Sequence, residues 1–150
     1  MSSFSFKSVG KTTEQQLIQQ FNAIRTQFGP VTPLQYANTG ADVFLMHTSL
    51  ADLVHDNLKN LLLTNRGERL VLTDYGANLL PLCTEFNGIE QFDEEALDRI
   101  KLSVEKWLPF IELEDYSSTL NNNFVKINIS YNINTLGIIG KQLQIELRIT

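Results

Sequence analysis

Hydrophobic residues recur along this chain at two periods, one typical of helices and one typical of strands. Apolar residues return every three or four positions in three segments, residues 13–28, 50–63 and 94–108. Further on, the chain has extended apolar segments at residues 110–116, 124–133 and 142–149, the last two with strict alternation. A period of 3.6 predicts amphipathic helices, and a period of 2 predicts strands with one face on a core. Helices followed by neighbouring strands indicate an α+β fold: two to three amphipathic helices on a small antiparallel C-terminal sheet, with an extra N-terminal helix.

The predicted N-terminal helix carries one apolar stripe on an otherwise polar surface. Thr13 and Gln16 are the predicted capping box at its start, and Gly29 and Pro30 are expected to end it. The stripe consists of Leu17, Phe21, Ile24 and Phe28. Such a helix either folds back on its own domain or lies in a groove of a partner, and the pattern leaves both open. The four stripe residues are therefore candidates for partner binding.

A loop-rich connector separates this helix from the rest of the chain. Residues 31–47 contain one proline, Pro33, shortly after Pro30, and a short extended piece at 43–46. We therefore divide the chain into residues 1–48, expected to dock on a partner, and a domain of residues 49–150. The next helix is predicted to start at Ser49 and to bury an apolar face. That face comprises Leu50, Leu53, Val54, Leu58, Leu61 and Leu62.

The last predicted strand offers an edge to other chains. It has no proline and runs to the end of the sequence, with its core-facing positions at Leu143, Ile145, Leu147 and Ile149. An uncovered edge presents backbone N–H and C=O groups that can accept a strand from a partner. The alternatives are that the N-terminal arm covers this edge or that water solvates it.

A polar corner lies between the second and third helices. The sequence TNRGER occupies residues 64–69, and DYGANL follows at residues 74–79. Gly67 permits a turn from which Arg66 and Arg69 project. Guanidinium groups bind carboxylates through two parallel hydrogen bonds, so both arginines are candidates for contact with a neighbouring subunit. The alternative is that they bind the chain's own acidic residues, such as Asp74.

The order of these motifs resembles the baseplate wedge or sheath-initiator family of contractile injection machines, which includes phage tails, type VI secretion baseplates and contractile bacteriocins. In that family a helix leads into a Thr-x-x-Gly-x-Arg corner, followed by a Phe-Gly or Tyr-Gly hook and a Leu. The resemblance covers residues 49–150. One motif departs: the family's Glu-Pro-Arg is Leu108-Pro109-Phe110 here, so a charged contact at that point is lost or replaced by an apolar one.

The resemblance implies a structural protein of a phage-type tail baseplate. Such a protein anchors in the wedge and nucleates sheath polymerisation by sharing strands through its open sheet edge. The implied partners are other wedge subunits and the tail sheath protein, with hub or tube proteins as further candidates. The implied location is the virion, after assembly in the host bacterial cytoplasm.

Composition and charge narrow the possible partners. The net charge of −5 argues against a nucleic-acid-binding protein. Ten acidic and three basic residues lie between positions 85 and 115, which is either a solvated helix face or a surface for a basic partner. Cys83 is the single cysteine, and no apolar run reaches 18 residues, so neither a disulfide framework nor a membrane partner is expected.

The candidate catalytic residues do not form a convincing set, so we do not expect an enzyme. The carboxylate pairs one could propose for glycan hydrolysis are Glu68 with Asp74 and Glu112 with Glu114. Two arginines flank Glu68 and should keep it ionised, which makes it a poor general acid. His47 and His55 lack a second pair at metal-binding spacing, and no cofactor motif is present. A small cytoplasmic adaptor is the alternative function, and a cell-wall glycan hydrolase is third.

Overall fold

The computed structural model describes residues 12–17, 27–38, 42–85, 89–121 and 124–148 of the 150. The chain divides into two compact units, Met1–Leu53 and Val54–Thr150. Each unit is described by itself below.

The helical start of the first unit lies one residue earlier than predicted. Residues 13–17 are helical, and the N–H of Gln15 donates to Oγ1 of Thr12 over 3.3 Å. The N–H of Thr12 donates in return to Oε1 of Gln15 over 3.1 Å. The capping box is therefore Thr12 with Gln15, one residue before the predicted Thr13 and Gln16. Phe21 and Ile24 lie outside the described residues.

The predicted extension of this helix to Phe28 is wrong, because Phe28 belongs to a two-stranded ribbon. Strand β1 (Gly29–Pro30) pairs antiparallel with β2 (Met46–His47). The N–H of Phe28 donates to the carbonyl of His47 over 3.0 Å, and the pairing continues past Pro30. A residue before proline avoids helical backbone angles, so Gly29 favours the extended ribbon.

The described residues of the second unit include three α-helices that differ in part from the prediction. Helix α2 (Leu50–Leu63), which crosses the division between the units, buries four of the expected residues but leaves Leu50 exposed. Helix α4 (Ile89–Trp107) starts five residues earlier than predicted and ends before Pro109, as expected. Helix α3 (Leu79–Glu85) was not predicted. Pro81 suggests a break in the sequence, but a proline is tolerated in the first turn, where its missing N–H has no partner.

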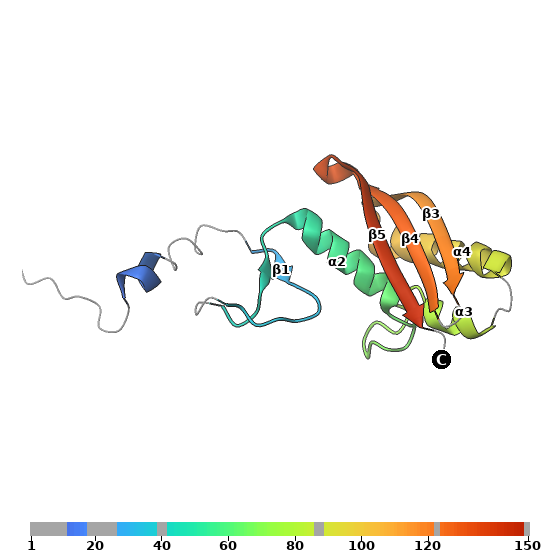
Figure 1. Ribbon diagram of the computed structural model, residues 1–150, viewed down its shortest axis with the longest axis horizontal. Coiled ribbons are helices and arrows are strands. Elements are labelled where there is room, and N and C mark those ends of the chain that lie inside the picture. Colours follow the sequence, from blue (N-terminus) through green and yellow to red (C-terminus); the bar gives the residue numbers. More distant parts are fainter. Residues whose placement is uncertain (1–11, 18–26, 39–41, 86–88, 122–123, 149–150) are drawn as a thin grey trace, which may run out of the picture. The chain divides into compact units, whose positions relative to one another are not determined.

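The three-stranded antiparallel sheet has the order β3-β4-β5 (Figure 1). Its strands are β3 (Ile111–Asn121), β4 (Phe124–Ile133) and β5 (Ile138–Arg148). Strand β3 is longer than predicted, and β5 begins four residues earlier. A 3-10 turn, η1 (Asn134–Leu136), ends at Gly137 with φ +64°, so the reversal is complete before Ile138. Gly140, expected in the turn, lies inside β5 at a register shift, where its N–H binds Oδ1 of Asn132 over 2.7 Å.

Helices cover one face of this sheet and enclose the core. Alternate residues of β4 and β5 are buried together with the apolar faces of α2, α3 and α4, and α4 runs behind the sheet in Figure 1. The side chains with the largest buried volumes include Tyr131, Leu58, Leu61, Ile100 and Ile127. Each such side chain contributes about 1.5–3 kcal/mol through burial of apolar surface. The predicted α+β class, with amphipathic helices on a small antiparallel sheet, is confirmed.

Candidate partner interface

The predicted polar corner is a closed loop at the end of α2, which we call the corner loop (residues 64–73). The carboxylate of Glu68 accepts hydrogen bonds from the backbone N–H of Asn65 over 2.9 Å and from its side-chain amide over 2.8 Å. The N–H of Gly67 donates to the carbonyl of Thr73 over 2.7 Å, which joins the two sides of the loop. Gly67 has φ +89°, a left-handed conformation that favours glycine. Glu68 therefore has an architectural role in the loop.

The hook (residues 74–78) caps the C-terminal end of α2. The N–H of Ala77 donates to the carbonyl of Leu61 over 3.1 Å, and the N–H of Asn78 donates to that of Thr64 over 3.4 Å. Carbonyls in the last turn of a helix lack partners within the helix, so these bonds satisfy them. Gly76 has φ +113°, and a Cβ there would lie 2.2 Å from the carbonyl oxygen of Thr64. Only glycine allows this close approach.

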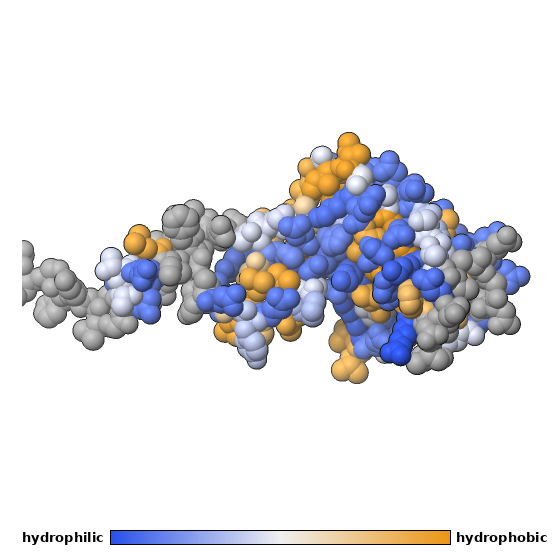
Figure 2. All heavy atoms as spheres, viewed as in Figure 1, coloured by the Kyte–Doolittle hydropathy of each residue, from blue (hydrophilic) through white to orange (hydrophobic). Residues whose placement is uncertain are grey.

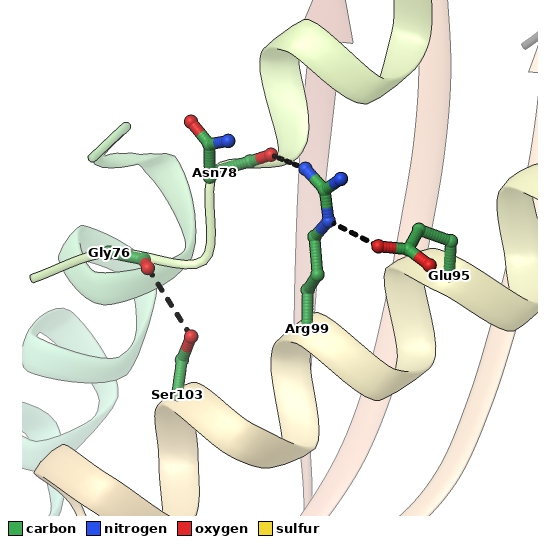
Figure 3. A network of polar contacts seen from close by, with 5 residues as sticks. All are labelled: Gly76, Asn78, Glu95, Arg99 and Ser103. Atoms are coloured by element: carbon green, nitrogen blue, oxygen red, sulfur yellow. Dashed lines mark hydrogen bonds and ion pairs between the residues drawn. The ribbon is translucent and has the colours of Figure 1, made fainter. Parts of the chain in front are cut away.

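Helix α4 holds the hook from the other side (Figure 3). The hydroxyl of Ser103 donates to the carbonyl of Gly76 over 3.3 Å, and Nη1 of Arg99 donates to that of Asn78 over 2.9 Å. Nε of Arg99 binds Oε1 of Glu95 over 2.8 Å. The hook is thus fixed between two helices. Arg99 and Ser103 were not predicted as site residues, because the polar positions of α4 are also typical of a solvated helix face.

Most charged side chains around the hook contact other side chains of the same chain. Lys106 on α4 forms an ion pair with Asp74. The guanidinium carbon of Arg69 lies 3.6 Å from the ring centroid of Tyr75. The Tyr75 ring packs edge-on against Trp107, with centroids 5.2 Å apart. Lys106 holds Asp74 through the ion pair, and the charge of Arg66 also lowers the pKa of Asp74. The alternative that the corner arginines act on the chain's own acids therefore stays open for Arg66.

Two acidic side chains of this region have lowered pKa values. The N–H groups of Asn65 lower the pKa of Glu68, chiefly through the backbone hydrogen bond. The ammonium group of Lys106 lowers the pKa of Asp74 through a hydrogen bond. Burial raises the pKa of Tyr75, while the charge of Arg69 opposes that change. Both shifts favour the ionised form of these carboxylates.

The structure separates the two predicted arginines. Arg69 is engaged with the Tyr75 ring, whereas the side chain of Arg66 lines an open groove together with Asp74, Leu102, Lys106 and Trp107. Arg66 is therefore the better placed of the two for contact with another chain. Its role in binding a partner stays a prediction.

The predicted edge residues of β5 face inward. Leu143, Ile145 and Leu147 are buried in the chain's own core, and Ile149 lies outside the described residues. A partner could therefore meet β5 only through its backbone edge. In the first unit, Leu17 is 56% exposed and Phe28 is 43% exposed, so both side chains are accessible within the described part of the chain.

Two apolar residues at the tip of the corner loop were not predicted as a site. Leu70 is 99% exposed and Val71 is 91% exposed. In Figure 2 the corner loop carries an apolar projection beside a largely hydrophilic surface. The sequence RLV after a glycine turn resembles the start of a buried strand, so exposure of both residues could not be read from the pattern.

The described residues offer no candidate for metal binding or for a membrane-spanning helix. Among these residues no group of three or more His, Cys, Asp and Glu side chains could hold a metal ion. No described helix is both long and apolar enough to span a membrane. Cys83 is buried in α3, and burial raises the pKa of its thiol.

Comparison with known proteins finds similarity at the level of the fold. No protein family and no curated protein sequence matches the chain. A chain of the anti-feeding prophage baseplate, solved by cryo-EM with sixfold symmetry, superposes with a TM-score of 0.61 and 18% identity, covering 74% of this chain and 87% of that one. A protein from Geobacter sulfurreducens named as a candidate tail lysozyme superposes with a TM-score of 0.54 and 18% identity, covering 70% and 94%. This chain therefore has the fold of a known tail baseplate component.

Proposed function

We propose that this chain is a structural subunit of the baseplate of a contractile tail, positioned in the wedge. The observation that carries the proposal is the fold shared with a chain of a prophage baseplate over 74% of the residues. The corner loop and hook support it, because their hydrogen-bonded backbone and α4 contacts make a rigid surface rather than a catalytic cleft. The proposed partners are other wedge subunits and the tail sheath protein, with hub or tube proteins as further candidates. The proposed location is the tail baseplate of the particle.

Within this role, we infer that the sheet nucleates the sheath through β5 rather than β3. Both are edge strands of the described sheet. The register of β3 shifts between Leu113 and Asp115, and this segment carries the acids Glu112, Glu114 and Asp115. Bulges discourage pairing at an edge, whereas charged residues do not separate the strands, because β5 carries Lys141, Glu146 and Arg148. Strand β5 pairs with β4 without a shift from Lys141 to Arg148, so its outer edge is the regular one that a partner strand fits.

A glycan hydrolase is the alternative that the candidate tail lysozyme suggests. The hydrolysis of a glycosidic bond needs one carboxylic acid kept protonated near neutral pH. Glu68 and Asp74 have lowered pKa values, since Glu68 is held by Asn65 of the corner loop and Asp74 by Lys106 of α4. We therefore propose a non-enzymatic role. A peptidoglycan turbidity assay checks it: clearing by the purified protein that is lost on Glu68→Gln would support the hydrolase instead.

The adaptor alternative differs in whether the protein remains in the assembled particle. A baseplate subunit stays at fixed stoichiometry, whereas an adaptor or chaperone leaves. Mass spectrometry of purified particles distinguishes the two. Electron microscopy of particles made without this chain then tests the role itself: we expect tubes or partial baseplates without sheath, restored by the chain supplied in trans. Complete sheathed tails in its absence would refute the proposal.

A further inference from the structure

The tip of the corner loop is an apolar projection held in a fixed position. The hydrogen bond from Gly67 to Thr73 joins the two sides of the loop below the tip. Leu70 and Val71 nevertheless make almost no contact with the chain, since they are 99% and 91% exposed. Single exposed apolar residues are ordinary, but two adjacent ones on a braced loop mark a contact surface.

Basic residues surround this tip. Arg66 and Arg69 belong to the same loop, and the one acidic residue among them, Glu68, has its carboxylate bound by Asn65. The tip therefore presents two apolar side chains with positively charged residues next to them. A complementary surface would be an apolar groove with acidic residues at its rim.

The same chain carries such a groove, where α4 meets β3. Its floor is formed by Leu97, Ile100, Leu113 and Ile129, and its volume is about 280 Å³. The acids Glu114 and Asp115 lie at its rim, beside the β3 register shift, together with Lys101 of α4 and Tyr116. An apolar protein cavity of roughly 150 Å³ can hold benzene, so this groove has room for an aliphatic side chain.

We propose that the Leu70–Val71 tip of one copy inserts into the α4–β3 groove of a second copy. Apolar side chains meet an apolar floor, and Arg66, the arginine that is not stacked on Tyr75, meets the acids Glu114 and Asp115 of the rim. The two surfaces are different patches of one molecule, so the contact is head-to-tail and joins successive copies into a ring or a row. Two side chains bury far less than the roughly 800 Å² per partner of a stable complex, so the contact is weak in solution and acts between copies that a larger assembly holds together.

Disulfide trapping between two full-length chains tests this contact even when it is weak. One chain carries Val71→Cys, and a second chain with a size tag carries Lys101→Cys at the groove rim. Mixed under mild oxidation, they should form the tagged heterodimer about tenfold faster than control pairs, because docking raises the local thiol concentration. The acceptor control is Leu102→Cys, the next residue of α4, which lines the other groove and is 61% exposed. The donor control is Ile139→Cys, an exposed apolar residue of β5.

A second change separates docking from random collision. Adding Leu70→Asp to the Val71→Cys chain should remove the rate advantage, and Asp115→Lys in the acceptor should reduce it. Equal rates for the test and control pairs would overturn the proposal. Faster pairing of Val71→Cys with itself would also overturn it, because a tip-to-tip contact is symmetric. Wild-type chains should not crosslink, because Cys83 is buried.

Discussion

At the residue scale, the contacts of Gly76 explain why the hook requires a glycine at this position. Gly76 lies against the last turn of α2, where its own carbonyl accepts from Ser103 and its neighbours cap the helix. The need for a glycine here could be predicted from the Tyr-Gly motif. The identity of the opposing atom, the carbonyl oxygen of Thr64, could not, because it depends on how the chain folds back.

Substitution of Gly76 should therefore be among the most destabilising changes in the chain. Gly76→Ala should lower the free energy of unfolding by about 3 kcal/mol, since it combines a left-handed backbone with a steric clash. Gly67→Ala is the matched control: its φ is also positive, but a Cβ there meets nothing within 4 Å. The control should cost about 1–2 kcal/mol. Equal losses for both variants in urea denaturation would show that the close approach to Thr64 is unimportant.

The arginines should differ from each other in assembly. Arg66→Glu should leave the melting temperature nearly unchanged and weaken incorporation into particles, because Arg66 lines an open groove. Arg69→Leu should lower stability by about 0.5–1 kcal/mol, through loss of the contact with the Tyr75 ring. Competition between variant and wild-type chains for incorporation, at two salt concentrations, gives the measurement. If the Arg66→Glu variant is incorporated normally at both salt concentrations, the corner loop has only a structural role within its own chain.

At the element scale, strict alternation and helical periodicity predicted most of what forms the core. The alternation in β4 and β5 placed the correct residues inward, because a strand must turn one face to the core. The errors had two causes. Phe28 pairs with His47, a partner distant in sequence, instead of continuing a helix. Local backbone geometry decides the other two, because Pro81 is tolerated in the first turn of α3 and the turn that ends at Gly137 lets β5 begin directly after it.

The packing of α4 on β3 predicts a dependence of stability on alkaline pH. The hydroxyl of Tyr116 donates to Asp93 over 3.2 Å, and burial, followed by the charge of Asp93, raises the pKa of Tyr116 well above its ordinary value. A raised pKa in the folded state means that this stabilisation is complete below pH about 10, the unfolded value, and is lost as pH rises above it.

Tyr116→Phe removes the titrating group and should flatten the decline in stability above pH 10. Urea denaturation between pH 8 and pH 11 gives the measurement, with Tyr36→Phe as the control, because Tyr36 is 82% exposed in the first unit. Identical pH dependence in Tyr116→Phe and in the wild-type protein would contradict the assignment to Tyr116. At pH 8 the Phe variant should be less stable by about 1 kcal/mol, through loss of the hydrogen bond.

At the scale of the whole molecule, the α+β class and its likeness to a baseplate component follow from the core and the sheet. The corner loop could be located from its motif, because glycine and charged residues at that spacing require a turn. The exposed Leu70–Val71 tip could not, because its exposure depends on how the loop is closed. Which subunit each surface meets depends on the partner, which the sequence of one chain does not contain. The domain division at residue 48 also stays a prediction.

The proposed binding of a partner by the N-terminal stripe can be tested at Leu17, whose side chain is exposed. Leu17→Asp should leave the melting temperature unchanged, because the side chain is 56% exposed, and should reduce incorporation if the stripe binds a wedge partner. Phe21→Asp and Ile24→Asp should behave alike if the stripe acts as a unit. A fall in the melting temperature with normal incorporation would assign the stripe to the chain's own core.

The central proposal is that the β5 edge starts the sheath, and removal of that edge tests it most directly. Deletion of residues 145–150 removes the end of the edge strand, and the double variant Ile145→Ala with Leu147→Ala serves as its control. The control loses buried side chains, at about 2–5 kcal/mol each, but keeps the backbone. Once circular dichroism establishes that both variants fold, particles should be counted by electron microscopy. We expect baseplates without sheath from the deletion and sheathed tails from the control. Sheathed tails at wild-type frequency from the folded deletion variant would contradict the account.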